Sequence, residues 1–138
     1  MNQYVRYGLA GSAVGMRASA GPFLAAWSSD GKPSLRPGLA FLGELVADKM
    51  PFVGSRVRPG PLLARVTAGA FAATKLSDGE ERSIALPAAI AIVSAIGVAI
   101  LANRLRTAIA DRTGVPDVIL GLVEDGICLA TIAAVANG

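Results

Sequence analysis

The feature that most constrains this chain is an uncharged run of nineteen residues at positions 84–102. A run of that length matches what an α-helix needs to cross the ~30 Å hydrocarbon core of a bilayer. Within it, Ala91, Ala95 and Ala99 recur at every fourth position, which predicts a smooth face for close helix packing. The run therefore predicts a membrane helix with one face covered by another helix.

The composition favours a membrane protein over a soluble one. Of 138 residues, 53% are hydrophobic and 17% are charged, whereas soluble domains carry about 25% charged residues. A soluble, alanine-rich helical bundle stays open as the alternative. The length predicts a single integral membrane domain over residues 1–138.

The residue types that the sequence lacks exclude several kinds of active site. The chain has no histidine, which excludes imidazole metal sites, Ser-His-Asp triads and Cys-His dyads. Its single cysteine, Cys128, lies in an apolar segment and is expected to be buried. Basic residues are scattered and form no patch with aromatic residues, so nucleic acid is not an expected partner. We expect no catalytic residue, metal or cofactor, and enzyme activity is the least favoured reading.

Four more apolar segments accompany the uncharged run, at 4–27, 38–50, 61–76 and 116–136. Together they predict an all-α, polytopic membrane helical bundle of four to five helices. The first segment carries Gly11 and Gly15 in a GxxxG pattern, which allows another helix to approach closely, and Pro22 predicts a kink in it. The thirteen residues of 38–50 reach only about 20 Å as a helix, so this segment is expected to be short, half-spanning or re-entrant.

Several charged side chains are embedded in these apolar segments. A charge at the centre of a membrane helix costs about 2.5–3.5 kcal/mol, so we expect internal ion pairs in which arginines neutralise the acids. Adjacent helical residues point about 100° apart, which predicts that Glu124 and Asp125 cannot both aim at one partner. We expect Asp48 to be solvated, near the membrane surface. The predicted polar core or substrate path consists of Arg17, Glu44, Asp48, Arg65, Glu124 and Asp125.

The order of the segments predicts an inverted internal repeat. Gly43-Glu44 and Gly121 with Glu124-Asp125 each follow a segment that carries arginine. If the fourth segment matches the first, the two units are inverted in the membrane, as in many transporters.

The loops between five alternating segments predict the orientation in the membrane. On one side lie seven basic residues, namely Arg6, Lys49, Arg56, Arg58, Arg104, Arg106 and Arg112. On the other side lie four, namely Lys32, Arg36, Lys75 and Arg82. The positive-inside rule then places the N-terminus in the cytoplasm and the C-terminus outside.

Short motifs along nearly the whole chain resemble those of one family. They are Gly15-Met16-Arg17, residues 43–51, Arg56 with Pro59-Gly60-Pro61 and Arg65, Ala68-Gly69-Ala70, and Pro116-Asp117 with Glu124-Asp125. The combination is similar to a group of small bacterial integral membrane proteins described only as a domain of unknown function. The resemblance implies a location in the bacterial inner (plasma) membrane and the same recurring polar residues, but no activity, substrate or cofactor.

Two function classes follow from the embedded charges. The leading one is a transporter- or channel-like protein for an ion or small solute, with an intramembrane core of arginines and carboxylates. The alternative is a structural or accessory subunit of a larger membrane complex, in which the ion pairs only lock the bundle. In either case we expect contact with the lipid bilayer and assembly as a homo-oligomer or with a partner membrane subunit.

Overall fold

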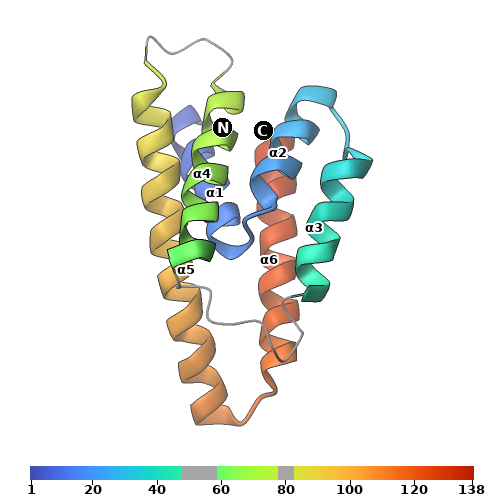
Figure 1. Cartoon of the computed structure of the whole chain (residues 1–138), viewed down its shortest axis with the longest axis vertical. Helices are drawn as coiled ribbons and strands as arrows, with labels where there is room; N and C mark the ends of the chain where they lie inside the picture. Colours follow the sequence, from blue (N-terminus) through green and yellow to red (C-terminus); the bar gives the residue numbers. More distant parts are fainter. Residues whose placement is uncertain (48–58, 78–82) are drawn as a thin grey trace.

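The computed structural model describes residues 1–47, 59–77 and 83–138. These residues form six α-helices and no strand (Figure 1). The helices are α1 (Gln3–Met16), α2 (Ala20–Asp30), α3 (Leu35–Ala47), α4 (Pro59–Leu76), α5 (Ala85–Thr113) and α6 (Asp117–Asn137). The all-α prediction is confirmed, with one helix more than the expected four to five.

Two of these helices are long and apolar enough to cross a membrane, namely α5 and α6. With 29 residues, α5 reaches about 43 Å. It ends at Gly114, whose φ of 68° is left-handed and whose N–H donates to the Ala110 carbonyl at 2.9 Å, as a glycine C-cap does. The polar stretch after 102 is thus a continuation of the same helix.

The alanine face of α5 is buried and receives α1. Ala91, Ala95 and Ala99 are at most 2% exposed. A Cβ atom on Gly11 would lie 2.2 Å from the Ala91 carbonyl oxygen, and one on Gly15 would lie 2.5 Å from that of Ala95. The GxxxG pattern is therefore the surface on which α1 approaches α5, because any side chain there would push the two backbones apart.

The first predicted segment is wrong as a single kinked helix. The chain leaves helical geometry at Arg17 (φ −141°, ψ 121°), restarts at Ala20, and reverses direction, so α1 and α2 form a hairpin inside the bundle (Figure 1). Pro22 does not kink a helix, because it is the third residue of α2. The N–H groups of the first turn have no partner within the helix, so a proline there removes no hydrogen bond.

Three other helices also have a proline in their first turn. Pro37, Pro61 and Pro87 are the third residues of α3, α4 and α5. The expected segments were 38–50 and 61–76, so α3 and α4 begin slightly earlier than expected. As predicted, α3 is short, and its thirteen residues correspond to about 20 Å.

The two termini lie at the same end of the bundle (Figure 1). A Cβ on Gly138 would lie 3.2 Å from the Met1 Cε atom, and Arg6 Nε donates to the Val135 carbonyl at 3.1 Å. The expectation of termini on opposite sides is therefore wrong. It depended on five alternating segments, whereas the α1–α2 hairpin returns to the end from which it starts.

The proposed inverted repeat gains no support from the arrangement of helices. The segment 4–27 is a hairpin of two short helices, whereas its expected counterpart, 84–102, is part of one long helix.

Candidate functional site

The turn of the α1–α2 hairpin, residues 17–19, lies deep in the bundle and is called the hairpin tip below. Gly15, two residues before it, packs on Ala95, and its added Cβ would lie 3.0 Å from Val98. The tip is therefore level with the uncharged run of α5. Arg17 at the tip is 1% exposed.

Both acids of the Glu124–Asp125 pair contact this one arginine. Arg17 Nη2 forms a short, charge-assisted hydrogen bond with Asp125 Oδ1, and Arg17 Nη1 lies 3.9 Å from Glu124 Oε1. The expectation that the two acids cannot share a partner is thus wrong. Their side chains diverge, but the two terminal nitrogens of a guanidinium are far enough apart to reach both.

Arginine side chains also stabilise the broken end of α1. Arg65 of α4 is 4% exposed, and its Nε donates to the Gly15 carbonyl at 3.0 Å. Arg17 Nη1 donates to the Met16 carbonyl at 3.1 Å. The last carbonyls of a helix lack partners within it and carry partial negative charge, which positively charged side chains offset. These contacts explain how a helix can end inside the bundle.

The start of α2 is stabilised by the opposite charge. Glu44 of α3 accepts from the backbone N–H of Ala18 at 3.1 Å and from that of Ser19 at 2.8 Å, and also from the Ser19 hydroxyl. A carboxylate at a helix N-terminus satisfies donors that have no intrahelical partner and interacts favourably with the helix dipole. Among the described residues Glu44 meets backbone and Ser19 donors rather than the arginine that we had expected.

A second arginine, Arg106 of α5, extends the charged cluster toward the surface. Arg106 pairs with Asp117, at the start of α6, through Nε and Nη2, and its Nη1 lies 3.6 Å from Glu124 Oε2. Gly121 leaves room for this guanidinium, since a Cβ there would lie 3.3 Å from Arg106 Nη2. The ion-pair chain Asp117–Arg106–Glu124–Arg17–Asp125 thus runs from a side chain that is 65% exposed to one that is 8% exposed.

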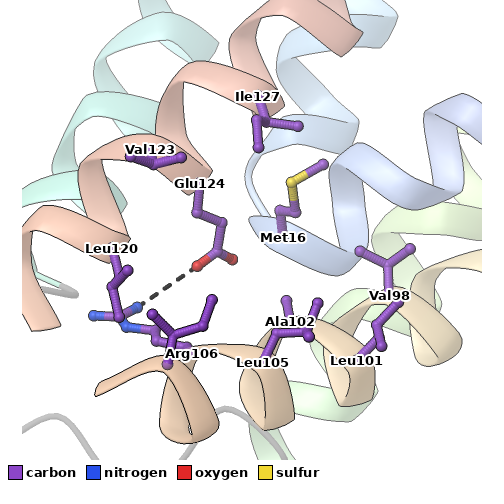
Figure 2. Close-up of a pocket in the computed structure, with 11 residues that line it drawn as sticks. Met16, Val98, Leu101, Ala102, Leu105, Arg106, Leu120, Val123, Glu124 and Ile127 are labelled. Carbon is purple, nitrogen blue, oxygen red and sulfur yellow. Dashed lines mark ion pairs between the residues drawn. The ribbon is translucent and has the colours of Figure 1, made fainter. Parts of the chain in front are cut away.

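A cavity of about 310 Å³ opens between α5 and α6, next to this chain of charges. This α5–α6 cavity lies in the half of the bundle away from the termini. Figure 2 shows aliphatic side chains of both helices and Met16 of α1 around the cavity. Glu124 and Arg106 also line it and point toward each other. The cavity therefore reaches a carboxylate that contacts the buried arginine of the hairpin tip.

Most of the predicted polar core converges on the hairpin tip. Arg17, Glu44, Arg65, Glu124 and Asp125 all contact it or the helix ends beside it. Asp48 lies outside the described residues. Within the part of the chain that the structure describes, no group of three His, Cys, Asp or Glu side chains could hold a metal ion. Cys128 is fully buried, as predicted.

Sequence reasoning missed three contributors: Arg106, Asp117 and Ser19. Arg106 was counted as a flanking charge outside the membrane, although its side chain is only 14% exposed. Its distance of eleven residues from Asp117 across the tight turn at Gly114 was the available signal, because helices joined by a short turn lie antiparallel.

Comparisons of this chain with protein-family models, with curated proteins and with solved structures give no match. Membership of the bacterial family that its motifs resemble stays a prediction.

Proposed function

We propose that this chain is an integral protein of the bacterial plasma membrane and that it is transporter- or channel-like for an ion or a small solute. The membrane location is supported by the surfaces of α5 and α6. Only 22% of the apolar window of α5 and 28% of that of α6 are buried within the chain. A core helix of a soluble protein would be mostly buried, and large exposed apolar surfaces mark contact with lipid or a partner.

The observation that carries the transport proposal is the α5–α6 cavity, which leads to Glu124. In a membrane, an ionisable side chain beside a cavity is the common sign of a path for ions or solutes. Two further features fit this role. The hairpin tip is an interruption of helical structure, and transporters use such broken helices near the bilayer midplane to hold substrate. Charged side chains of other helices bind both helix ends: Arg65 of α4 binds the end of α1, and Glu44 of α3 binds the start of α2.

The orientation follows from the shared end of the termini. The proposal keeps the N-terminus in the cytoplasm and places the C-terminus there as well, because both termini lie at the same end of the bundle.

Charge movement across a membrane tests the proposal. Proteoliposomes adsorbed on a solid-supported membrane are exposed to concentration jumps of protons, NaCl and KCl, with Glu124→Gln as the variant and Asp30→Asn as the matched control. Asp30 is an exposed carboxylate at the far end of α2. We expect a current for one of the ions that Glu124→Gln abolishes and Asp30→Asn preserves. Equal currents in correctly assembled wild-type and Glu124→Gln protein would contradict the proposal.

A structural or accessory subunit is the second candidate, and one observation favours it. Arg17, Glu44, Glu124 and Asp125 each contact groups within the chain, as ion pairs that only lock a bundle would do. This candidate predicts a fixed partner in native mass spectra of gently solubilised membranes, and loss of that assembly when Arg17 is replaced. A homo-oligomer with ion currents would instead support the transport proposal.

A further inference from the structure

A second cavity, of about 290 Å³, is walled by α2, the end of α4 and the start of α3. It shares no lining residue with the α5–α6 cavity and is called the α2–α4 cavity below. On α2 its lining extends from Pro22 in the first turn to Ser29 in the last turn, a rise of about 10 Å. The α2–α4 cavity therefore follows most of the length of α2.

The two ends of the α2–α4 cavity differ in polarity. Its inner end, beside the hairpin tip, lies where α2 packs closely on α4: a Cβ on Gly21 would lie 2.6 Å from the Ala68 carbonyl oxygen. The lining residue at this end is Pro22, which is apolar. At the outer end the lining includes the hydroxyl of Ser29 and the ammonium group of Lys75, in the last turn of α4. The cavity thus changes from apolar to polar along α2.

The outer end lies where lipid headgroups are expected if the chain spans a membrane. Figure 1 shows that α2 and α4 end, and α3 begins, at the end of the bundle where the two termini lie. Trp27 is two residues before Ser29, in the last turn of α2. Amphipathic tryptophan rings are favoured at the membrane interface. The polar end of the cavity would therefore face headgroups, and its apolar end would lie at the depth of acyl chains.

Lys75 supplies a positive charge that a ligand can reach. Its side chain is exposed, and the ion pairs between described residues do not include it. The Ser29 hydroxyl instead donates to the Ala25 carbonyl at 2.9 Å, and Asp30, which ends α2, does not line the cavity. Phe71, one turn before Lys75, offers apolar surface for the stem of the lysine and for a ligand. Basic pockets between membrane helices bind acidic lipid headgroups in this way.

From this change of polarity along one cavity we propose that the α2–α4 cavity binds an anionic phospholipid. The phosphate lies at Lys75, and one acyl chain lies against Phe71 and the first turn of α2. Free phosphate would match Lys75 alone, and a lipid without net charge would match mainly the apolar end, so an anionic lipid fits both ends. The inference rests on the membrane location in the proposed function and is independent of transport.

Quenching of Trp27 fluorescence tests the inference, because Trp27 is the only tryptophan of the chain and follows Ala26, which lines the cavity. The full chain is reconstituted in phosphatidylcholine vesicles. Phosphatidylglycerol or phosphatidylcholine with the same brominated acyl chains is then added in increasing fractions. We expect the brominated phosphatidylglycerol to quench at an about fivefold lower fraction, the scale of one lysine near an anionic lipid. Equal quenching by the two lipids would overturn the inference.

Two variants, each with a matched control, separate the charge from the walls. Lys75→Gln should abolish the lipid preference, whereas Lys32→Gln, at an exposed lysine that does not line the cavity, should keep it. Ala26→Phe fills the cavity without changing its charge and should also abolish the preference, whereas Ala40→Phe, on the exposed surface of α3, should not. A preference that survives in Lys75→Gln or in Ala26→Phe, or that is lost equally in Lys32→Gln, would overturn the inference.

Two further measurements identify the ligand and separate the inference from the proposed function. Inorganic phosphate, compared with chloride at the same ionic strength, should leave the lipid preference unchanged, and its loss in phosphate alone would overturn the inference. Extraction of the vesicles with alkaline carbonate measures membrane insertion. A chain that resists extraction but shows no lipid preference would overturn the inference and leave the membrane location standing. A chain that is extracted would contradict the membrane location and, with it, the inference.

Discussion

Replacement of Asp125 by Asn tests whether the buried ion pair at the hairpin tip holds the bundle together. Arg17 is 1% exposed and the Asp125 side chain is 8% exposed, and they form a short hydrogen bond. Removal of one member of a buried pair costs about 3–5 kcal/mol, because the other charge stays buried. Since Glu124 lies 3.9 Å from Arg17 and retains part of the compensation, we expect a loss of about 3 kcal/mol.

The ion-pair chain supplies its own matched control. Asp117→Asn makes the same chemical change and also takes an aspartate from an arginine, but the Asp117 side chain is 65% exposed. Exposed pairs contribute about 0–1 kcal/mol, so this variant should unfold almost as wild type. Unfolding is followed in mixed micelles by titration with dodecyl sulfate, with Trp27 fluorescence as the probe. Trp27 packs on Phe23 with ring centroids 5.8 Å apart, so it reports on the docking of α2.

The comparison between the two variants decides the result. If Asp125→Asn and Asp117→Asn lower the free energy of unfolding equally, or if neither lowers it, the buried pair does not stabilise the hairpin tip and the reasoning is refuted. A double variant, Arg17→Gln with Asp125→Asn, should be less destabilised than the sum of the single variants, because the two residues are in direct contact.

Three further predictions concern packing, capping and topology. Gly11→Ala should destabilise the bundle by about 2 kcal/mol, because the added Cβ would lie 2.2 Å from the Ala91 carbonyl oxygen. Gly97→Ala, whose added Cβ would have nothing within 4 Å, should be neutral or stabilising by up to about 1 kcal/mol. Thermal unfolding distinguishes the two variants, and equal effects would contradict the close approach of α1 and α5. Glu44→Ala should lower the free energy of unfolding by about 2 kcal/mol, because the N–H groups at the hairpin tip lose their acceptor, and Glu44→Gln should lower it less. If both variants unfold as wild type in the same assay, Glu44 does not stabilise the hairpin tip. Reporter fusions at the two termini should place both in the cytoplasm, and termini on opposite sides would contradict the hairpin.

The long helices could be predicted from the sequence because their signal is local. The uncharged run 84–102 and the alanine face of α5 each depend on neighbouring residues alone, and the structure has the expected helix with that face buried. The ends of the short helices were harder to predict. A proline inside an apolar segment is compatible with a kink and with a helix start. Pro22 was expected to kink a helix, but it lies in the first turn of α2.

The break at residues 17–19 could not be predicted, because what stabilises it comes from distant parts of the chain. Arg65 binds the Gly15 carbonyl, 50 residues away in sequence, and Glu44 binds the Ser19 N–H, 25 residues away. The cost of burying charge predicted that these charged side chains would lie together. It did not predict that their partners would be backbone groups, because such groups are available only where a helix ends.

The interior position of Arg106 was missed for a related reason. The residue lies beyond the uncharged run, and flanking arginines normally mark the membrane surface. Here α5 continues for eleven residues after position 102, and Gly121 leaves space for the guanidinium to turn inward toward Glu124. The register between α5 and α6 was needed to see this, and the short turn at Gly114, with Asp117 eleven residues after Arg106, was the signal for it.

The accessibility of the cavity to water is the most direct test of the central claim, that a path from one side of the membrane reaches the charged cluster. In a Cys128→Ala background, which has no other thiol, a cysteine at Ile127 lies in the cavity wall and one at Leu122, also on α6, lies outside it. A membrane-impermeant thiol reagent should label Ile127→Cys from the side opposite the termini and leave Leu122→Cys unlabelled from both sides. Labelling of Ile127→Cys from the terminal side, or from neither side, would contradict the account.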